Sequence, residues 1–218
     1  MKNLLYKEFK LATHPTCYIF MLFGLMLLIP SYPYYVAFFY TCLGTFFVFM
    51  IGRENKDTFF TVLLPIAKRD AVKARILLVA SFQLGTVLLS VPWAFIGVMI
   101  NPNPETGNAA GIESNVAFYG LVLIMFSVFN AIYIPKFYKT AYKAGAPFIV
   151  ASVAMGLFIG VAEALVAIPS PIKDYLDTTE VSKQLLQLPV LFAGILIWLV
   201  TLVLVFKKSA KNFEKVDL

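Results

Sequence analysis

Long apolar runs constrain the fold of this chain more than any other feature of its sequence. A helix that crosses the hydrocarbon core of a bilayer needs about 17–25 predominantly apolar residues. Four runs have such a length, and they cover 76–100, 116–134, 148–168 and 190–206. Charged residues make up only 14% of the chain, against about 25% in an ordinary soluble domain. We therefore predict an all-α polytopic membrane protein with a single transmembrane domain over 1–218.

A further apolar run, 17–51, is too long for one span. As a continuous helix it would be about 52 Å long, because each residue adds about 1.5 Å. Pro30 and Pro33 interrupt it, and proline cannot continue the hydrogen-bond ladder of a helix. We therefore predict two short spans at about 17–30 and 34–51, which makes six spans in all.

The distribution of basic residues favours six spans with both termini in the cytoplasm. With that topology only Lys173 and Lys183, of the 18 lysines and arginines, lie outside. Such a bias follows the positive-inside rule, which accounts for the net charge of +6 without a nucleic-acid partner.

Three segments outside the spans have amphipathic patterns. At 100° per residue, 1–15 separates into an apolar and a basic face, which predicts a helix lying in the membrane interface. Glu8 falls within the apolar arc, where it either pairs locally or snorkels, or else makes a buried contact with a basic group of the next cytoplasmic loop. The external loop 169–189 is expected to contain a short helix. The cytoplasmic loop 52–75 has clustered phenylalanines and leucines that are too few to span, whereas the C-terminal segment 207–218 is polar.

Two features lie inside the predicted spans. Glu163 is the one ionisable residue within a span, and an intramembrane acid usually faces a bundle interior or a wet cavity, which makes it a pathway candidate. Small residues repeat every four positions in the same span and predict helix packing, within the bundle or in a dimer: Ser152, Gly156, Gly160 and Ala164. Interhelical hydrogen bonding is expected for Gln83 and Asn130.

Motifs for catalysis are missing from the sequence. It has neither a His-Glu-x-x-His zinc motif nor a Gly-x-Ser-x-Gly elbow, and it lacks the Gly-x-x-x-x-Gly-Lys-Ser/Thr phosphate loop. We therefore predict a chain that is not an enzyme and that binds no cofactor or metal of its own.

The loop sequence Leu-Pro-Ile-Ala-Lys-Arg-Asp-Ala-Val-Lys-Ala-Arg at 64–75, with Glu54 before it, resembles the permease subunits of bacterial type-2 ABC (ATP-binding cassette) exporters. Ala67 stands where that family often has serine. The resemblance extends to the predicted topology, in the short six-span form similar to peptide and lantibiotic exporters.

This resemblance implies a cytoplasmic coupling helix that docks in a cleft of a separate ATPase subunit. It further implies a dimer of permeases in the bacterial plasma membrane, ATP and Mg²⁺ on the partner ATPase, and export of an amphipathic peptide. The residues assigned to ATPase coupling are Glu54, Phe59, Phe60, Leu63, Leu64, Pro65, Lys68 and Arg69. A stand-alone secondary carrier or channel is the alternative, since Glu163 and the small-residue repeat would suit one.

Overall fold

The computed structural model describes residues 1–100, 108–141, 143–178 and 180–216. Every regular element in these ranges is a helix, which confirms the all-α prediction. Five helical segments are long and apolar enough to cross a membrane, so the chain is a polytopic membrane protein. They comprise α3 (Tyr35–Glu54), α5 (Lys68–Ile100), α6 (Val116–Tyr138), α7 (Gly145–Ala167) and α10 (Leu188–Glu214).

The N-terminal region forms a sharply bent pair of helices. One arm consists of α1 (Lys2–Lys7) and the π-helical turn η1 (Glu8–Ala12), and the other of α2 (Pro15–Met21) and the 3₁₀ segment η2 (Leu22–Leu28). The arms meet at 92°. The second arm is about 25 Å long, because its 3₁₀ half rises about 2.0 Å per residue. This falls short of a bilayer core of about 30 Å. The count of six spans therefore stays a prediction, in which this pair supplies the first span.

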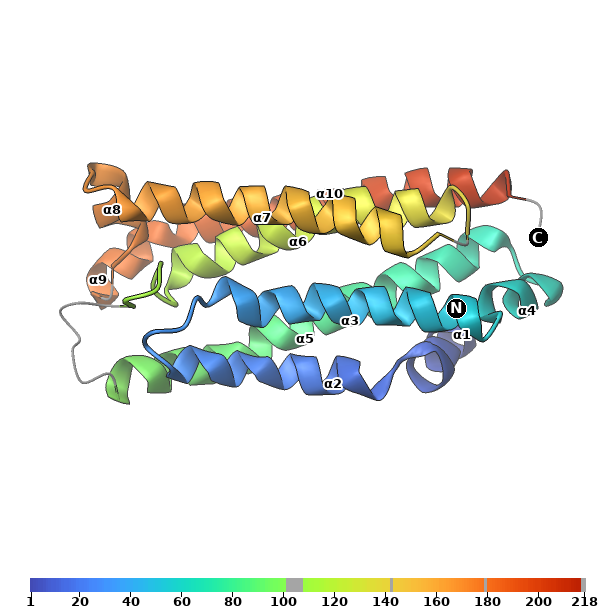
Figure 1. Cartoon of the computed structure of the whole chain (residues 1–218), viewed down its shortest axis with the longest axis horizontal. Helices are drawn as coiled ribbons and strands as arrows, with labels where there is room; N and C mark the ends of the chain where they lie inside the picture. Colours follow the sequence, from blue (N-terminus) through green and yellow to red (C-terminus); the bar gives the residue numbers. More distant parts are fainter. Residues whose placement is uncertain (101–107, 142, 179, 217–218) are drawn as a thin grey trace.

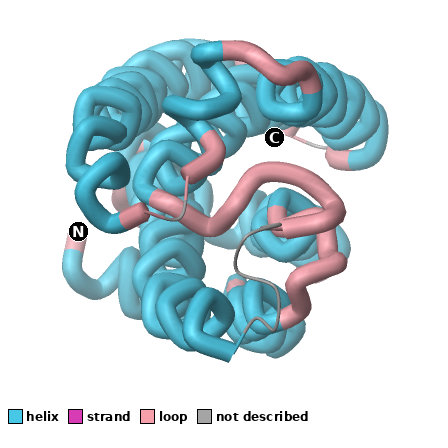
Figure 2. Tube along the Cα trace, turned by 90° about the vertical axis from the view of Figure 1, so that its left-hand side faces the viewer, coloured by secondary structure: helices cyan, strands magenta, loops and turns pink. Residues whose placement is uncertain are grey.

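The long helices lie side by side in two groups (Figure 1). In this view α2, α3 and α5 form the lower group, and α6, α7 and α10 form the upper one. Viewed end on, the same helices form a closed bundle whose near end is crossed by loops (Figure 2).

The two ends of the bundle carry different short elements. The N-terminus, the C-terminus and α4 (Asp57–Leu63) lie together at one end, called the α4 end below (Figure 1). The other end, called the α8 end, holds α8 (Pro171–Leu176) and α9 (Val181–Gln184), followed by the 3₁₀ turn η3 (Leu185–Gln187).

The core is aromatic and centres on α6. Phe118, Phe126, Phe129 and Tyr133 of this helix are fully buried. Neighbouring rings from α3 pack against them edge to face, as Phe49 does on Tyr133 with centroids 5.3 Å apart. Such aromatic pairs add to the free energy gained by burying their area. Buried side chains of α6 thus join the two groups of helices.

A polar contact crosses the middle of the bundle. The amides of Gln83 on α5 and Asn130 on α6 exchange two hydrogen bonds of 2.9 Å, and Trp198 on α10 donates its indole N–H to Gln83 at 2.9 Å. The interhelical hydrogen bonding expected for Gln83 and Asn130 is thereby confirmed.

Two helices extend beyond the apolar runs that predicted them. The basic stretch before 76 forms the first turns of α5, which begins at Lys68 and continues without a break into the span. The last helix runs to Glu214, so the polar C-terminal segment is not a loose tail. Phe213 is buried there against Tyr138, with ring centroids 5.2 Å apart.

Candidate coupling site

A short helix, α4, follows α3 almost directly at the α4 end of the bundle. Lys56, with φ 53°, lies in the left-handed region and forms the turn between the two helices. An extended residue, Leu64, ends α4, and Pro65 follows it. The helix is therefore short because both of its boundaries are set by local backbone geometry.

One face of α4 is fixed to the bundle by polar side chains. Asp57 and Thr61 are four residues apart and thus lie on the same side of the helix. Thr61 is buried, and its hydroxyl donates to Asp57 at 3.4 Å. The ammonium of Lys7 in α1 donates to the Thr61 hydroxyl at 2.7 Å and lies 2.7 Å from the Asp57 carboxylate.

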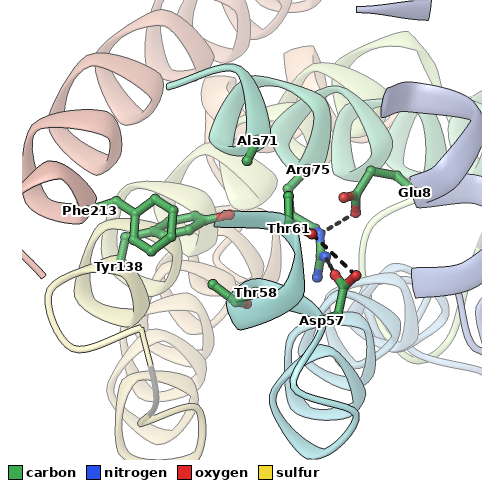
Figure 3. Close-up of a pocket in the computed structure, with 8 residues that line it drawn as sticks. All are labelled: Glu8, Asp57, Thr58, Thr61, Ala71, Arg75, Tyr138 and Phe213. Carbon is green, nitrogen blue, oxygen red and sulfur yellow. Dashed lines mark hydrogen bonds and ion pairs between the residues drawn. The ribbon is translucent and has the colours of Figure 1, made fainter. Parts of the chain in front are cut away.

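Arg75, on the second turn of α5, is the centre of these contacts (Figure 3). Its guanidinium makes ion pairs with Glu8 through Nε and with Asp57 through Nη2, while Nη1 donates to the carbonyl of Val48 at 3.3 Å. It also lies over the ring of Phe49, 5.6 Å from the centroid. A planar guanidinium can bind three partners in different directions, which a single ammonium group does less well.

The position of Glu8 tests the two sequence-based interpretations. Its side chain is 3% exposed, and its carboxylate contacts Arg75 as well as the neighbouring Lys7. Glu8 therefore makes the buried contact with a basic group of 52–75, Arg75, which the structure places in α5, and it also pairs locally with Lys7.

The charges within this site balance. Lys7 and Arg75 are paired with Glu8 and Asp57, and we call these four residues the charge cluster. Burial alone would raise the pKa of Asp57, but the nearby Arg75 and Lys7 lower it below its usual value. Asp57 is consequently ionised at neutral pH, as an ion pair with a buried arginine requires.

The opposite face of α4 is apolar and uncovered within the described part of the chain. The large side chains there have high exposed fractions: Phe59 42%, Phe60 59%, Leu63 67% and Leu64 51%. A groove of about 530 Å³ lies beside this face, between the end of α3 and Ala141, and is lined by Arg53, Glu54, Lys56 and Phe59 among others. Exposed phenylalanines and leucines in a charged rim are typical of a protein-docking surface.

The other residues assigned to coupling lie around α4 in different environments. Glu54 is half exposed and contacts Arg53 at 3.4 Å, and Pro65 is exposed. Lys68 donates to the carbonyl of Val216 at 2.7 Å, and Arg69 lies 3.9 Å from Glu214. The two basic residues thus connect the start of α5 to the C-terminal end of α10.

Sequence reasoning missed the polar side of this site. Lys7, Asp57 and Arg75 were not singled out, and neither was Phe213, which lines the same small cavity as Glu8 (Figure 3). The one available signal was the acid in the apolar arc of the N-terminal helix. Its partner could not be chosen among the basic residues of 52–75 without the fold.

Three members of the small-residue repeat of α7 point away from the rest of the chain, whereas the fourth, Ser152, is half-buried and its hydroxyl oxygen is buried in the bundle. A methyl group added at Gly156 or Gly160 would meet nothing within 4 Å, and Ala164 is exposed. Packing of these glycines within the bundle, one of the two expected arrangements, is therefore wrong. A dimer interface remains the prediction for this face.

Glu163, near the α8 end of α7, holds a loop of the chain. Its carboxylate accepts a hydrogen bond from the backbone N–H of Ile112 at 3.1 Å. Gly111, with φ 151°, lets the backbone approach this carboxylate, since a side chain there would collide with it. Nearby, burial and the charge of Asp177 raise the pKa of Glu113. The side chain of Glu163 is only partly buried.

Comparisons with known proteins gave one match. A family model described as "ABC-2 family transporter protein" matches residues 3–214. No curated protein and no solved structure matches the chain.

In the described ranges, no group of three or more histidine, cysteine, aspartate or glutamate side chains could hold a metal ion.

Proposed function

The chain belongs to the ABC-2 family of transporter proteins, in which it is a membrane-embedded transport component, and we propose that it is the permease subunit of an exporter driven by a separate ATPase. The permease has no phosphate loop of its own, so the energy must arrive through a protein contact. In this assembly the ATPase subunit holds ATP and Mg²⁺, and the permease supplies the path.

The uncovered apolar face of α4 carries the proposal. Four large side chains protrude from a helix whose other face is tied to the bundle by ion pairs. A partner that binds Phe59, Phe60, Leu63 and Leu64 would therefore act on a helix that is already connected to the spans. Buried aromatic and leucine anchors with a charged rim supply the affinity and the register of such contacts.

We propose that the α4 end faces the bacterial cytoplasm. Both termini and α4 lie at this end (Figure 1), and the segments there contain most of the lysines and arginines. Such an excess is characteristic of the cytoplasmic side of a membrane protein. This orientation places the docking face where an ATPase would be found.

A second copy of the permease is the proposed partner for α7. Gly156, Gly160 and Ala164 form an open strip on its outer face, and small residues allow two helices to approach closely in lipid. The strip is framed by exposed apolar side chains such as Leu157 and Val161. A homodimer that pairs these strips would enclose the transport path between two bundles.

We expect Gly160→Leu to lower the dimeric fraction by about ten-fold, because the larger side chain would separate the paired helices by more than the small-residue contact tolerates. Cross-linking in native membranes and mass determination in mild detergent measure this. Leu165→Phe, at an exposed position on a different face of α7, is the matched control and should leave the dimer intact. A Gly160→Leu protein that dimerises and transports normally would place the strip against lipid.

An amphipathic cationic peptide is the substrate class that we propose, following the resemblance to short peptide exporters. Glu163 then acts as an electrostatic contact at the far end of the path. Glu163→Gln retains an oxygen that can accept the Ile112 N–H but removes the charge. We expect transport of a labelled cationic peptide to fall by about ten-fold, the low end of steering effects. Asp174→Asn, in α8, is the control; equal transport by both variants would leave Glu163 a purely structural role.

Affinity purification distinguishes the permease from a stand-alone carrier or channel. A tagged chain solubilised in mild detergent should bring down a protein that hydrolyses ATP and carries a phosphate loop. A carrier would purify alone, and reconstituted into vesicles it would transport without added ATP. ATP hydrolysis by the reconstituted complex, measured against panels of cationic peptides, lipids and drugs, then identifies the substrate class.

A further inference from the structure

The charge cluster has a geometry that docking of α4 alone does not require. Each nitrogen of the Arg75 guanidinium contacts a different element: Nε reaches Glu8 in η1, Nη2 reaches Asp57 in α4, and Nη1 reaches Val48 in α3. Gly52 leaves room for this arrangement, because a methyl group at that position would lie 2.8 Å from Nη1. One buried side chain therefore joins four elements, including its own helix.

The connections of α4 along the backbone are two short segments. The turn at Asn55 and Lys56 joins it to α3, and Leu64–Ala67 joins it to α5. Its polar face is held instead by Lys7 and Arg75, at the side chains of Asp57 and Thr61. These contacts are charge-assisted and largely screened from water, so they weaken steeply if α4 moves alone.

We propose that the charge cluster makes the N-terminal helix, which consists of α1 and η1, move together with α4. Glu8 and Arg75 are the positioning residues of this connection, which we call the joint. The inference rests on the proposed function, in which an ATPase displaces α4. A displacement transmitted through the backbone would reach only α3 and α5. The cluster adds η1, which leads through the 92° bend directly into α2 and η2, so the motion also reaches the first apolar arm of the bundle.

Arg75→Lys tests this proposal without changing the charge balance. A lysine keeps the positive charge, but one ammonium cannot occupy the three directions of the guanidinium fork. The measurement is amide hydrogen exchange of the purified permease–ATPase complex, with and without a non-hydrolysable ATP analogue. In the unmodified complex, Lys2–Ala12 and Asp57–Leu63 should both change their exchange when the analogue binds.

In the Arg75→Lys complex, the response of Asp57–Leu63 should persist, whereas that of Lys2–Ala12 should fall by at least about five-fold, the lower end for coupling between two sites. Asp70→Asn, an exposed acid on the first turn of α5, is the control and should keep both responses. The pair Lys7→Gln, Asp57→Asn removes one cation and one anion from the less buried side of the cluster. This double variant should have the same effect on hydrogen exchange as Arg75→Lys, and it replaces Arg75→Lys in the experiment if that variant folds in low yield.

The outcomes separate this inference from the proposed function. The joint would be overturned if hydrogen exchange of Lys2–Ala12 did not change when the analogue binds to the unmodified complex. It would also be overturned if this change were as large in both cluster variants as in the unmodified complex. Either result would leave the permease assignment intact. A folded cluster variant that no longer binds the ATPase would also overturn it, because the cluster would then belong to the docking surface. Failure of the unmodified chain to bind an ATPase would instead overturn the proposed function itself.

Discussion

The double variant Phe60→Asp, Leu64→Asp should lose its ATPase while remaining folded. Both side chains are more than half exposed in the isolated chain, so their replacement removes little packing from the bundle. In the complex they would be buried, where each anchor is worth about 2 kcal/mol or more and a buried unpaired carboxylate adds a further cost. Together the two changes should weaken association by about a thousand-fold, since about 4 kcal/mol corresponds to three powers of ten.

Co-purification and the ATPase affinity of reconstituted permease measure this effect. The matched control is Leu185→Asp, Leu186→Asp, because these leucines are each 64% exposed and lie at the α8 end, away from α4. The control should bind the ATPase normally. If the Phe60, Leu64 variant binds and transports as well as the control, the docking assignment is wrong, and the ATPase-driven mechanism loses its main support.

The spans were predictable because bilayer thickness sets their length. Apolar runs at 116–134 and 148–168 predicted α6 and α7 to within a few residues. The helices α5 and α10 are longer than their runs because polar residues continue a helix once it has left the lipid, and hydropathy does not register this. The N-terminal bend is consistent with an interfacial helix over 1–15 followed by a span from 17, since the 92° bend lies between Ala12 and Pro15, and Pro30 and Pro33 mark the loop after η2.

The candidate site was predictable on its apolar face alone. Clustered phenylalanines and leucines in a loop too short to span, with the family resemblance, predicted a docking helix, and the exposure of Phe60 and Leu63 is consistent with that interpretation. The polar face depends on side chains that are more than 50 residues apart in the sequence, as Lys7 is from Thr61. Sequence spacing predicts neighbours on one helix, but it does not select a partner on another.

The glycines also show that sequence spacing reveals a pattern on one helix but not a contact between two helices. The four-residue spacing in α7 is visible in the sequence, yet a methyl group added at Gly156 or Gly160 would meet nothing within 4 Å. One close helix contact inside the bundle uses one glycine from each of two helices, Gly120 of α6 and Gly194 of α10. A single glycine in a span forms no pattern, so this contact was not predicted.

Replacement of Gly194 by valine should therefore be the most damaging single change in the chain. A Cβ atom at Gly194 would lie 2.8 Å from the carbonyl carbon and the Cα atom of Gly120, and one at Gly120 would lie 2.8 Å from the carbonyl carbon of Val190. These neighbours are backbone atoms, which cannot rotate aside as a side chain can. The two helices must separate, and overpacking of this kind costs about 3 kcal/mol or more.

Separation of α6 from α10 should also break the hydrogen bond from Trp198 to Gln83, which gives the experiment a direct signal. In a Trp93→Phe background, emission from Trp198 reports its surroundings, and thermal unfolding in detergent reports stability. Gly194→Val should lower the folded yield and shift this emission, with Gly194→Ala intermediate. Gly145→Val is the control, because a side chain at Gly145 meets nothing within 4 Å. Normal folding and unchanged Trp198 emission in Gly194→Val would mean that the backbones of α6 and α10 do not touch, and the arrangement of the upper group of helices would have to be revised.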